Sequence, residues 1–284
     1  MSLSVGEALR DGLGRTFERN GLLLMAVFVG LRAVSTVAAD TLTRANLELA
    51  RQLEAFPSEA VPTGLAGLAE TPTPYALHVN LAVAFVLMVA VALVAEAVRI
   101  VAVRTLVSER RDTIPAAYAR RNIVLATLNG FVGGIVVLTL TTIGLVALVL
   151  PGLFVGLSFF FVRQEIAVQD KNFVDAMAGS WELATGHRLE LLWLGLALAI
   201  VGLVASIPGF LIGVIAPGVG TAVGVLMRAV VLVFSVASVA RAYEQLRTAM
   251  VADETTDDET TDDGPNYDSA LTADELPPPD ADRS

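Results

Sequence analysis

The sequence predicts an all-α integral membrane protein with six transmembrane helices. Only 17% of the residues are charged, against roughly 25% in soluble domains, and 55% are hydrophobic. Residues 122–162 contain no Asp, Glu, Lys or Arg, and residues 191–227 form a second such run. A helix rises about 1.5 Å per residue, so the first run would be about twice as long as a bilayer's hydrocarbon core is thick. Each run is therefore predicted to hold two membrane crossings.

Six spans of about twenty residues account for the apolar segments. They cover about 21–39, 76–98, two halves of 122–162, 189–207 and 219–240. The turn between the third and fourth spans has two candidate positions. Residues 141–144 would give two equal helices, and Pro151-Gly152 is the stronger helix breaker. Pro208-Gly209 and Pro217-Gly218 predict broken helix between the fifth and sixth spans.

The arginines predict how the chain is oriented. Thirteen lysines and arginines fall on one side of the six spans, in residues 1–20, 104–121, 163–188 and 241–247. The other side has only Arg44 and Arg51, both in the loop of residues 40–75. Loops rich in lysine and arginine stay in the cytoplasm, so both termini are expected there, in a multi-pass protein of the cell membrane.

Two segments outside the spans have distinct compositions. In the outer loop of residues 40–75, residues 41–56 carry an apolar stripe at helical spacing, which predicts a separate helix or an extension of the first span. Residues 251–284 hold twelve acidic residues and one arginine, and they are predicted to be a disordered cytoplasmic tail. The transmembrane domain is then expected to comprise residues 1–250.

Three segments of the chain resemble one another. Glu7-Ala8-Leu9 aligns with Asp175-Ala176-Met177, and this alignment also superimposes the spans that follow; residues 114–118 form a shorter third copy. The Pro151-Gly152 segment is likewise echoed by Pro208-Gly209. We expect three repeats of a short helix followed by a hairpin, related by an axis along the membrane normal. Chance similarity between apolar segments is the alternative.

Four charged residues within the spans form a candidate intramembrane polar cluster: Arg32, Glu96, Arg99 and Arg228. An arginine at the bilayer centre costs about 2.5–3.5 kcal/mol on insertion scales, so Arg32 and Arg228 are expected to face the bundle or water. Glu96 is the expected carboxylate partner for either of them. The cluster would line a path for a substrate or ion, or it would fix helix packing. Glu96 and Arg99 could also pair with each other, one helical turn apart.

Residues 174–188 predict an amphipathic helix before the fifth span. Four apolar residues recur there at helical spacing, and Gly186 is placed as a C-cap. Trp181 is expected to anchor this helix in the membrane interface. A surface that docks a partner is the alternative.

This stretch also carries a family resemblance. Pro-Gly, an apolar span, Arg163 with Glu165, and a helix ending Thr-Gly-His-Arg occur in an order that resembles an uncharacterised multi-pass membrane protein family of haloarchaea. The wider relatives of that family include the membrane domain fused to glycerophosphodiester phosphodiesterases. The likeness covers about residues 7–247, and the single lysine against eighteen arginines is typical of a halophilic source. No phosphodiesterase catalytic domain is present, so the resemblance implies no activity and no functional residues.

Residue types needed for most catalytic and metal sites are missing. There is no cysteine, which excludes disulfides and thiolate metal sites. The two histidines, His78 and His187, fall on opposite sides of the predicted membrane, and no GxxxxGK motif occurs to cradle phosphate. We expect no catalytic, metal or cofactor site, and no nucleic-acid partner.

These expectations lead to a non-enzymatic membrane protein, a scaffold or a membrane-assembly factor. Its partners would be the lipid bilayer and other membrane proteins or a second copy of the chain. The alternative is a small transporter or channel component with a polar path at Arg32, Glu96 and Arg228.

Overall fold

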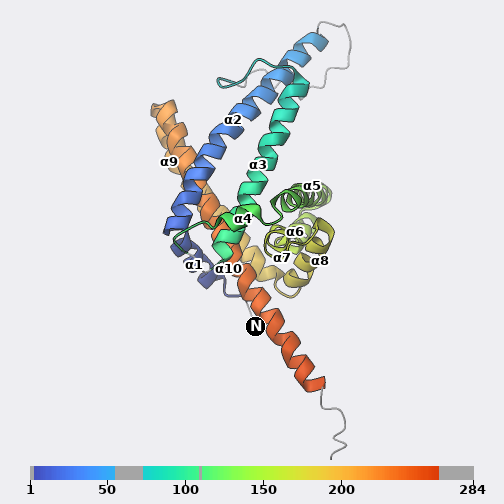
Figure 1. Cartoon of the computed structure of the whole chain (residues 1–284). Helices are drawn as coiled ribbons and strands as arrows, with labels where there is room; N and C mark the ends of the chain where they lie inside the picture. The colour runs from blue at the N-terminus through green and yellow to red at the C-terminus, as the bar shows by residue number, and fades with distance from the viewer. Residues whose placement is uncertain (1–2, 55–72, 109–110, 262–284) are drawn as a thin grey trace, which may run out of the picture.

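The structure, a computed structural model, describes residues 3–54, 73–108 and 111–261, and each regular element in these ranges is a helix (Figure 1). The helices are α1 Val5–Phe17, α2 Arg19–Glu54, α3 Leu81–Val107, α4 Ala116–Arg120, α5 Ile123–Ala147, α6 Val149–Ser158, α7 Val162–Gln169, α8 Phe173–Ala184, α9 Arg188–Ile215 and α10 Pro217–Thr261. Six helical stretches are long and apolar enough to cross a membrane: Arg19–Gln52, Leu81–Val107, Ile123–Ala147, Val149–Gln169, Arg188–Ile215 and Gly218–Ala252. The chain is therefore an all-α, multi-pass membrane protein.

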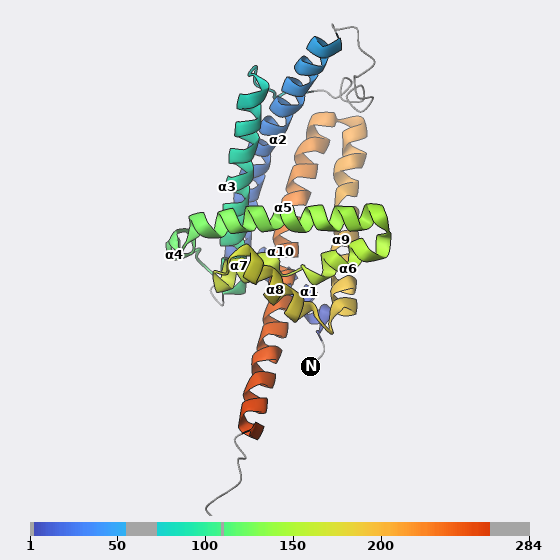
Figure 2. The same cartoon turned by 90° about the vertical axis from the view of Figure 1, so that its right-hand side faces the viewer.

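Two hairpins give the molecule its long axis. α2 pairs with α3 and α9 pairs with α10. Figure 2 shows all four helices upright, and Figure 1 shows that the two hairpins lean in opposite directions and cross. They correspond to the first, second, fifth and sixth predicted spans. α2 continues without interruption to Glu54, so the helix expected from residue 41 is an extension of the first span. The remainder of the outer loop, residues 55–72, lies outside the described residues.

The middle hairpin lies across the other two hairpins instead of alongside them. Figure 1 views α5 nearly end-on, and Figure 2 shows it from the side, running across the direction of α3. α6 returns from the far end of α5, and residues 159–161 separate it from α7. The prediction that an axis along the membrane normal relates all three hairpins is therefore wrong for the middle one. α5 is uncharged on every face, so its composition indicates apolar surroundings but gives no direction.

The turn between α5 and α6 lies at Leu148, between the two positions that the sequence offered. Pro151 falls in the first turn of α6, where its missing N–H breaks no helical hydrogen bond. The helix therefore starts just before this proline and does not end at it. A Cβ on Gly144 would lie 2.7 Å from the Cα of Gly152, so these two glycines let the arms of the hairpin close tightly.

The α9–α10 hairpin turns at Ala216. α9 passes through Pro208 without ending, so the expected break is confined to Ala216, and Pro217 is the first residue of α10, a position that suits proline. A Cβ on Gly220 would lie 2.3 Å from the Cα of Gly213, which again indicates close approach. The predicted correspondence between Pro151-Gly152 and Pro208-Gly209 is wrong, because the first pair begins a returning helix and the second lies within an outgoing one.

Short helices surround one end of the upright hairpins, which we call the arginine-rich end (Figure 2). A buried core joins α1, α8, α9 and α10 there, around Phe161, Leu191, Leu194 and Tyr243. α1, α4 and α8 each precede a hairpin, which is the order that the repeat predicts. When Glu7 is aligned with Asp175, the four buried residues of α1 also fall on buried residues of α8: Ala8 on Ala176, Gly12 on Ser180, Arg15 on Leu183 and Thr16 on Ala184.

α10 continues beyond the predicted domain boundary at residue 250. It ends at Thr261, so residues 251–261 are helical where the composition predicted a disordered tail. Nucleating a helix is the costly step, whereas extending one fixes a single residue per new hydrogen bond. A polar segment can therefore continue a helix that it could not start. Residues 262–284 of the predicted tail lie outside the described residues.

Candidate functional site

Two arginines bind the carboxylate of Glu96 on α3. Its Oε1 accepts a hydrogen bond of 2.7 Å from Nε of Arg163 on α7. Its Oε2 accepts bonds from Arg163 Nη2 at 3.2 Å and from Arg99 Nη1 at 3.4 Å. Only 5% of the Glu96 side chain is exposed. This triad ties α7, which follows the crosswise hairpin, to the upright α3.

The predicted four-residue cluster is divided in two by the fold. The pairing of Glu96 with Arg99 that the sequence allowed is confirmed, and Arg163, which was assigned to a cytoplasmic loop, joins them. The expectation that Glu96 pairs with Arg32 or Arg228 is wrong. Glu96 lies against α5 and α7, whereas Arg228 belongs to α10 and Arg32 lines a groove with α9 and α10.

Arg32 and Arg228 line one groove between α2 and the α9–α10 hairpin, which we call the Arg32–Arg228 groove. Its volume is about 750 Å³. Both arginines are exposed, and neither side chain makes an ion pair or hydrogen bond with another described residue. Each would cost about 2.5–3.5 kcal/mol at the centre of a bilayer if nothing neutralised it.

A second buried carboxylate, Glu165 on α7, is a site residue that the sequence did not reveal. Its side chain is fully buried. Its Oε1 accepts a hydrogen bond of 2.8 Å from Tyr243 Oη and another of 3.4 Å from Arg247 Nη1, and its Oε2 accepts from Lys171 Nζ. Two cations and a tyrosine therefore hold this acid between α7 and α10. The signal was present, since Glu165 is the first acidic residue after the uncharged run of residues 122–162.

Arg104, near the end of α3, donates hydrogen bonds to residues at or near the ends of α4 and α7. Its Nε donates to the Ala167 carbonyl at 2.7 Å, and its Nη1 donates to the carbonyls of Tyr118 at 2.9 Å and Arg121 at 2.6 Å. Its Nη2 donates to Asp170 Oδ1 at 2.9 Å. Because Arg104 is buried and serves carbonyls from α4 and α7, it acts as a structural clamp.

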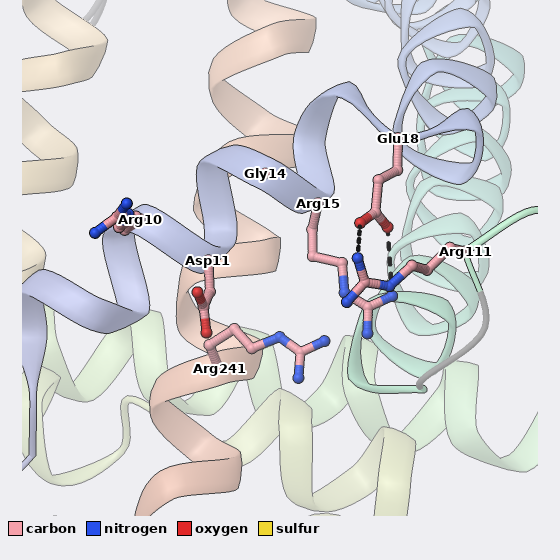
Figure 3. Close-up of a pocket in the computed structure, with 7 residues that line it drawn as sticks. All are labelled: Arg10, Asp11, Gly14, Arg15, Glu18, Arg111 and Arg241. Carbon is pink, nitrogen blue, oxygen red and sulfur yellow. Dashed lines mark hydrogen bonds and ion pairs between the residues drawn. The ribbon is translucent and has the colours of Figure 1, made fainter.

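A basic cavity of about 600 Å³ lies at the arginine-rich end. Figure 3 shows the residues that line it: Arg10, Asp11, Gly14, Arg15, Glu18, Arg111 and Arg241. Glu18 pairs with Arg111 at 2.9 Å and with Arg15 at 3.6 Å. Burial lowers the pKa of Arg15, and the nearby guanidinium of Arg241 lowers it further. Four arginines and two carboxylates line the cavity, and Glu244 pairs with Arg241 beside it, so a net positive charge remains that attracts anions.

Trp181 lies on α8, and the glycine that the sequence predicts as the C-cap, Gly186, lies just past the end of this helix. The Asn172 side chain accepts hydrogen bonds from the first turn, and Gly186 just past the end has a φ of +85°. The Trp181 ring packs edge-on against Phe154 of α6 at 5.5 Å between centroids, and the Arg188 guanidinium lies 5.1 Å from it. Trp181 therefore fixes α8 against α6. Its place in a membrane interface stays a prediction.

The structure shows no cluster of metal-ligating side chains within its described residues. No three His, Asp or Glu side chains come together there as a metal ion would require. The buried carboxylates Glu96 and Glu165 are instead bound by cationic side chains of the fold.

Residues 3–246 match a protein family described as "Domain of unknown function (DUF7847)". The chain belongs to this family. The DUF7847 match covers both upright hairpins, the crosswise hairpin and the short helices, and it ends before the acidic segment. No curated protein and no solved structure matches the chain. The resemblance to haloarchaeal proteins and to the phosphodiesterase-linked membrane domain stays a prediction.

Proposed function

We propose that this DUF7847 protein is a non-enzymatic scaffold or membrane-assembly factor of the cell membrane. The observation that carries the proposal is that both buried carboxylates are fully engaged within the fold. Glu96 is held by Arg99 and Arg163, and Glu165 by Lys171, Arg247 and Tyr243. A cation- or proton-coupled transporter uses intramembrane acids as a relay, so an acid must exchange its partner during the cycle. Acids tied to two cations each are better suited to holding helices together.

The arrangement of the arginines supports an orientation with both termini in the cytoplasm. The basic cavity collects arginines at one end, whereas Arg44 and Arg51 belong to the other end of α2. The positive-inside rule places the basic cavity on the cytoplasmic side. There it offers a docking position for an acidic segment of a partner protein.

The repeat hypothesis is part of the same proposal. The matching buried faces of α1 and α8 support a common origin for the two upright hairpins with their leading helices. The middle copy differs by lying across them, which gives the scaffold apolar surface in a second direction.

A co-purification experiment tests the scaffold role. The tagged full-length protein is extracted from native membranes in mild detergent, and the partners that remain are quantified by mass spectrometry. The substitution Arg10→Gln removes an exposed arginine of the basic cavity. The substitution Arg51→Gln is the matched control, since Arg51 is 69% exposed at the other end of α2.

We expect a partner at fixed stoichiometry with the wild type and with Arg51→Gln, and a clear loss with Arg10→Gln. Equal recovery with both variants would remove the basic cavity from the proposal. A wild-type protein that retains no partner under any extraction condition would contradict the scaffold role itself.

The Arg32–Arg228 groove favours a second candidate function, a small transporter or channel component. Two arginines that face one groove, neither of them paired with another described residue, are what an anion path needs. Glu96 would take no part in that path, because Arg99 and Arg163 hold it elsewhere.

A further inference from the structure

The Arg32–Arg228 groove combines two positive charges with no described counter-charge. Arg32 lies thirteen residues into α2 and Arg228 eleven residues into α10, about 20 Å and 16 Å along their helices. Both positions belong to helical stretches that are long and apolar enough to cross a membrane. The two guanidiniums repel each other in such surroundings, so an anion between them would stabilise both.

Other polar groups of the groove already have partners. The hydroxyl of Thr36 donates to the Arg32 carbonyl at 2.9 Å, and the hydroxyl of Ser206 donates to the Leu203 carbonyl at 2.6 Å. The guanidiniums therefore supply the available donors. Each is a planar fork with five N–H groups, a geometry that matches the oxygens of a phosphate in bidentate fashion.

The shape of the groove indicates a ligand larger than a bare ion. Its volume of about 750 Å³ is in the range of pockets that hold organic ligands. Phe210 and Val214 line it and are 72% and 73% exposed, so its rim is apolar and open to the side. A smaller cavity of about 250 Å³ continues from Arg228 between α9 and α10, along Gly202 and Leu232.

We propose that the Arg32–Arg228 groove binds a phosphate group, and that a phospholipid supplies it. The phosphate lies between the two guanidiniums, and the acyl chains lie against the apolar rim and the adjoining cavity. The inference is independent of the scaffold role, because it rests on α2, α9 and α10 and not on the basic cavity.

Lipid binding to the purified full-length protein in detergent tests this site. The probes are fluorescent phosphatidylglycerol, fluorescent diacylglycerol with the same chains but no phosphate, and inorganic phosphate as a competitor. The proteins are the wild type, Arg32→Gln, Arg228→Gln, the double variant, and Arg51→Gln as the control. Arg228→Lys keeps the charge without the planar fork. Size-exclusion profiles establish that each variant is folded.

We expect phosphatidylglycerol to bind the wild type and Arg51→Gln equally, and diacylglycerol to bind much more weakly. Each single glutamine variant should weaken binding about tenfold or more, since it removes one charge-assisted pair, and Arg228→Lys should keep part of the affinity. A different result would be binding of inorganic phosphate only when both arginines are present, with phosphatidylglycerol binding no better than diacylglycerol. That result would support a phosphate site and overturn the claim that a phospholipid supplies the phosphate. Equal binding of both lipids, with no effect of the arginine variants and no phosphate binding, would overturn the site.

Discussion

Gly130 on α5 lies directly against the carboxylate of Glu96 on α3, where a Cβ would be 2.8 Å from Oε1. The same relationship recurs at the second buried acid, because a Cβ on Gly179 would lie 2.6 Å from Oε2 of Glu165. Each buried carboxylate is thus faced by a glycine on a neighbouring helix. The glycines let helix backbones approach groups that are already bound to cations.

The substitution Gly130→Ala should destabilise the fold. The added methyl meets Glu96 and forces a shift of a side chain that is tied to Arg163, with an expected cost of about 1–3 kcal/mol. Gly134→Ala is the matched control on α5, since its Cβ would meet only Arg163 Nη2 at 3.9 Å. Alanine's better helix propensity favours both variants by up to about 1 kcal/mol, so their difference isolates the clash. Unfolding followed by circular dichroism in micelles measures it, and equal midpoints would contradict the contact.

The stability losses from removing each member of the Glu96–Arg163 pair should not add up. Glu96→Gln leaves the Arg163 guanidinium short of its main partner, and we expect a loss of about 3 kcal/mol, the lower end for buried pairs because Arg163 is 38% exposed. The double variant Glu96→Gln/Arg163→Gln should lose less than the sum of the two single losses. Denaturant unfolding of the four proteins in a double-mutant cycle measures the coupling. Additive losses would show that the pair does not tie α3 to α7.

The hydroxyl of Tyr243 should matter for stability as a donor to a buried acid. Tyr243→Phe removes the 2.8 Å bond to Glu165 and leaves the ring packing in place. The expected loss is about 1.5–3 kcal/mol, typical of a hydrogen bond to a charged group. Tyr118→Phe is the control, since no hydrogen bond of the Tyr118 hydroxyl occurs among the described residues. Thermal unfolding of both variants measures the difference, and equal losses would contradict the role of Tyr243.

Arg104→Lys should loosen the connection between α3, α4 and α7. An ammonium has three donors and no planar fork, so it cannot serve three carbonyls and Asp170 together. Trypsin should then cleave at Arg120 and Arg121 faster than in the wild type. Arg99→Lys, which changes an arginine with a single contact of 3.4 Å, should leave the cleavage rate unchanged. An unchanged rate in Arg104→Lys would mean that the clamp is dispensable.

Much of the architecture follows from local sequence signals. Charge-free runs predict the number of apolar helices, because a spanning helix must be long and apolar. The Pro-Gly pairs indicate that each run divides into two helices. Asn172 and Gly186 mark the ends of α8 through capping chemistry that depends only on neighbouring residues. The pairing of Glu96 with Arg99 follows from their spacing on one helix.

The direction of α5 and the long-range ion pairs could not be predicted in the same way. Arg163 is 67 residues from Glu96, and Tyr243 is 78 residues from Glu165. Such pairs depend on how helices cross, and hydropathy carries no information on crossing. The role of Arg104 could not be predicted for a related reason. Three of its four acceptors are backbone carbonyls, which every residue carries and which therefore leave no signal in the sequence.

The claim that this protein holds partners and does not move solutes is tested most directly by flux into liposomes. Wild type and Arg228→Leu are reconstituted at equal density, and uptake of phosphate, sulfate and chloride is measured against protein-free liposomes. We expect both proteins to give the background rate for every anion. The two buried acids are each bound by two cationic side chains, and a lipid phosphate occupies the groove. Uptake of one anion by the wild type that Arg228→Leu abolishes would contradict this account and establish a transporter.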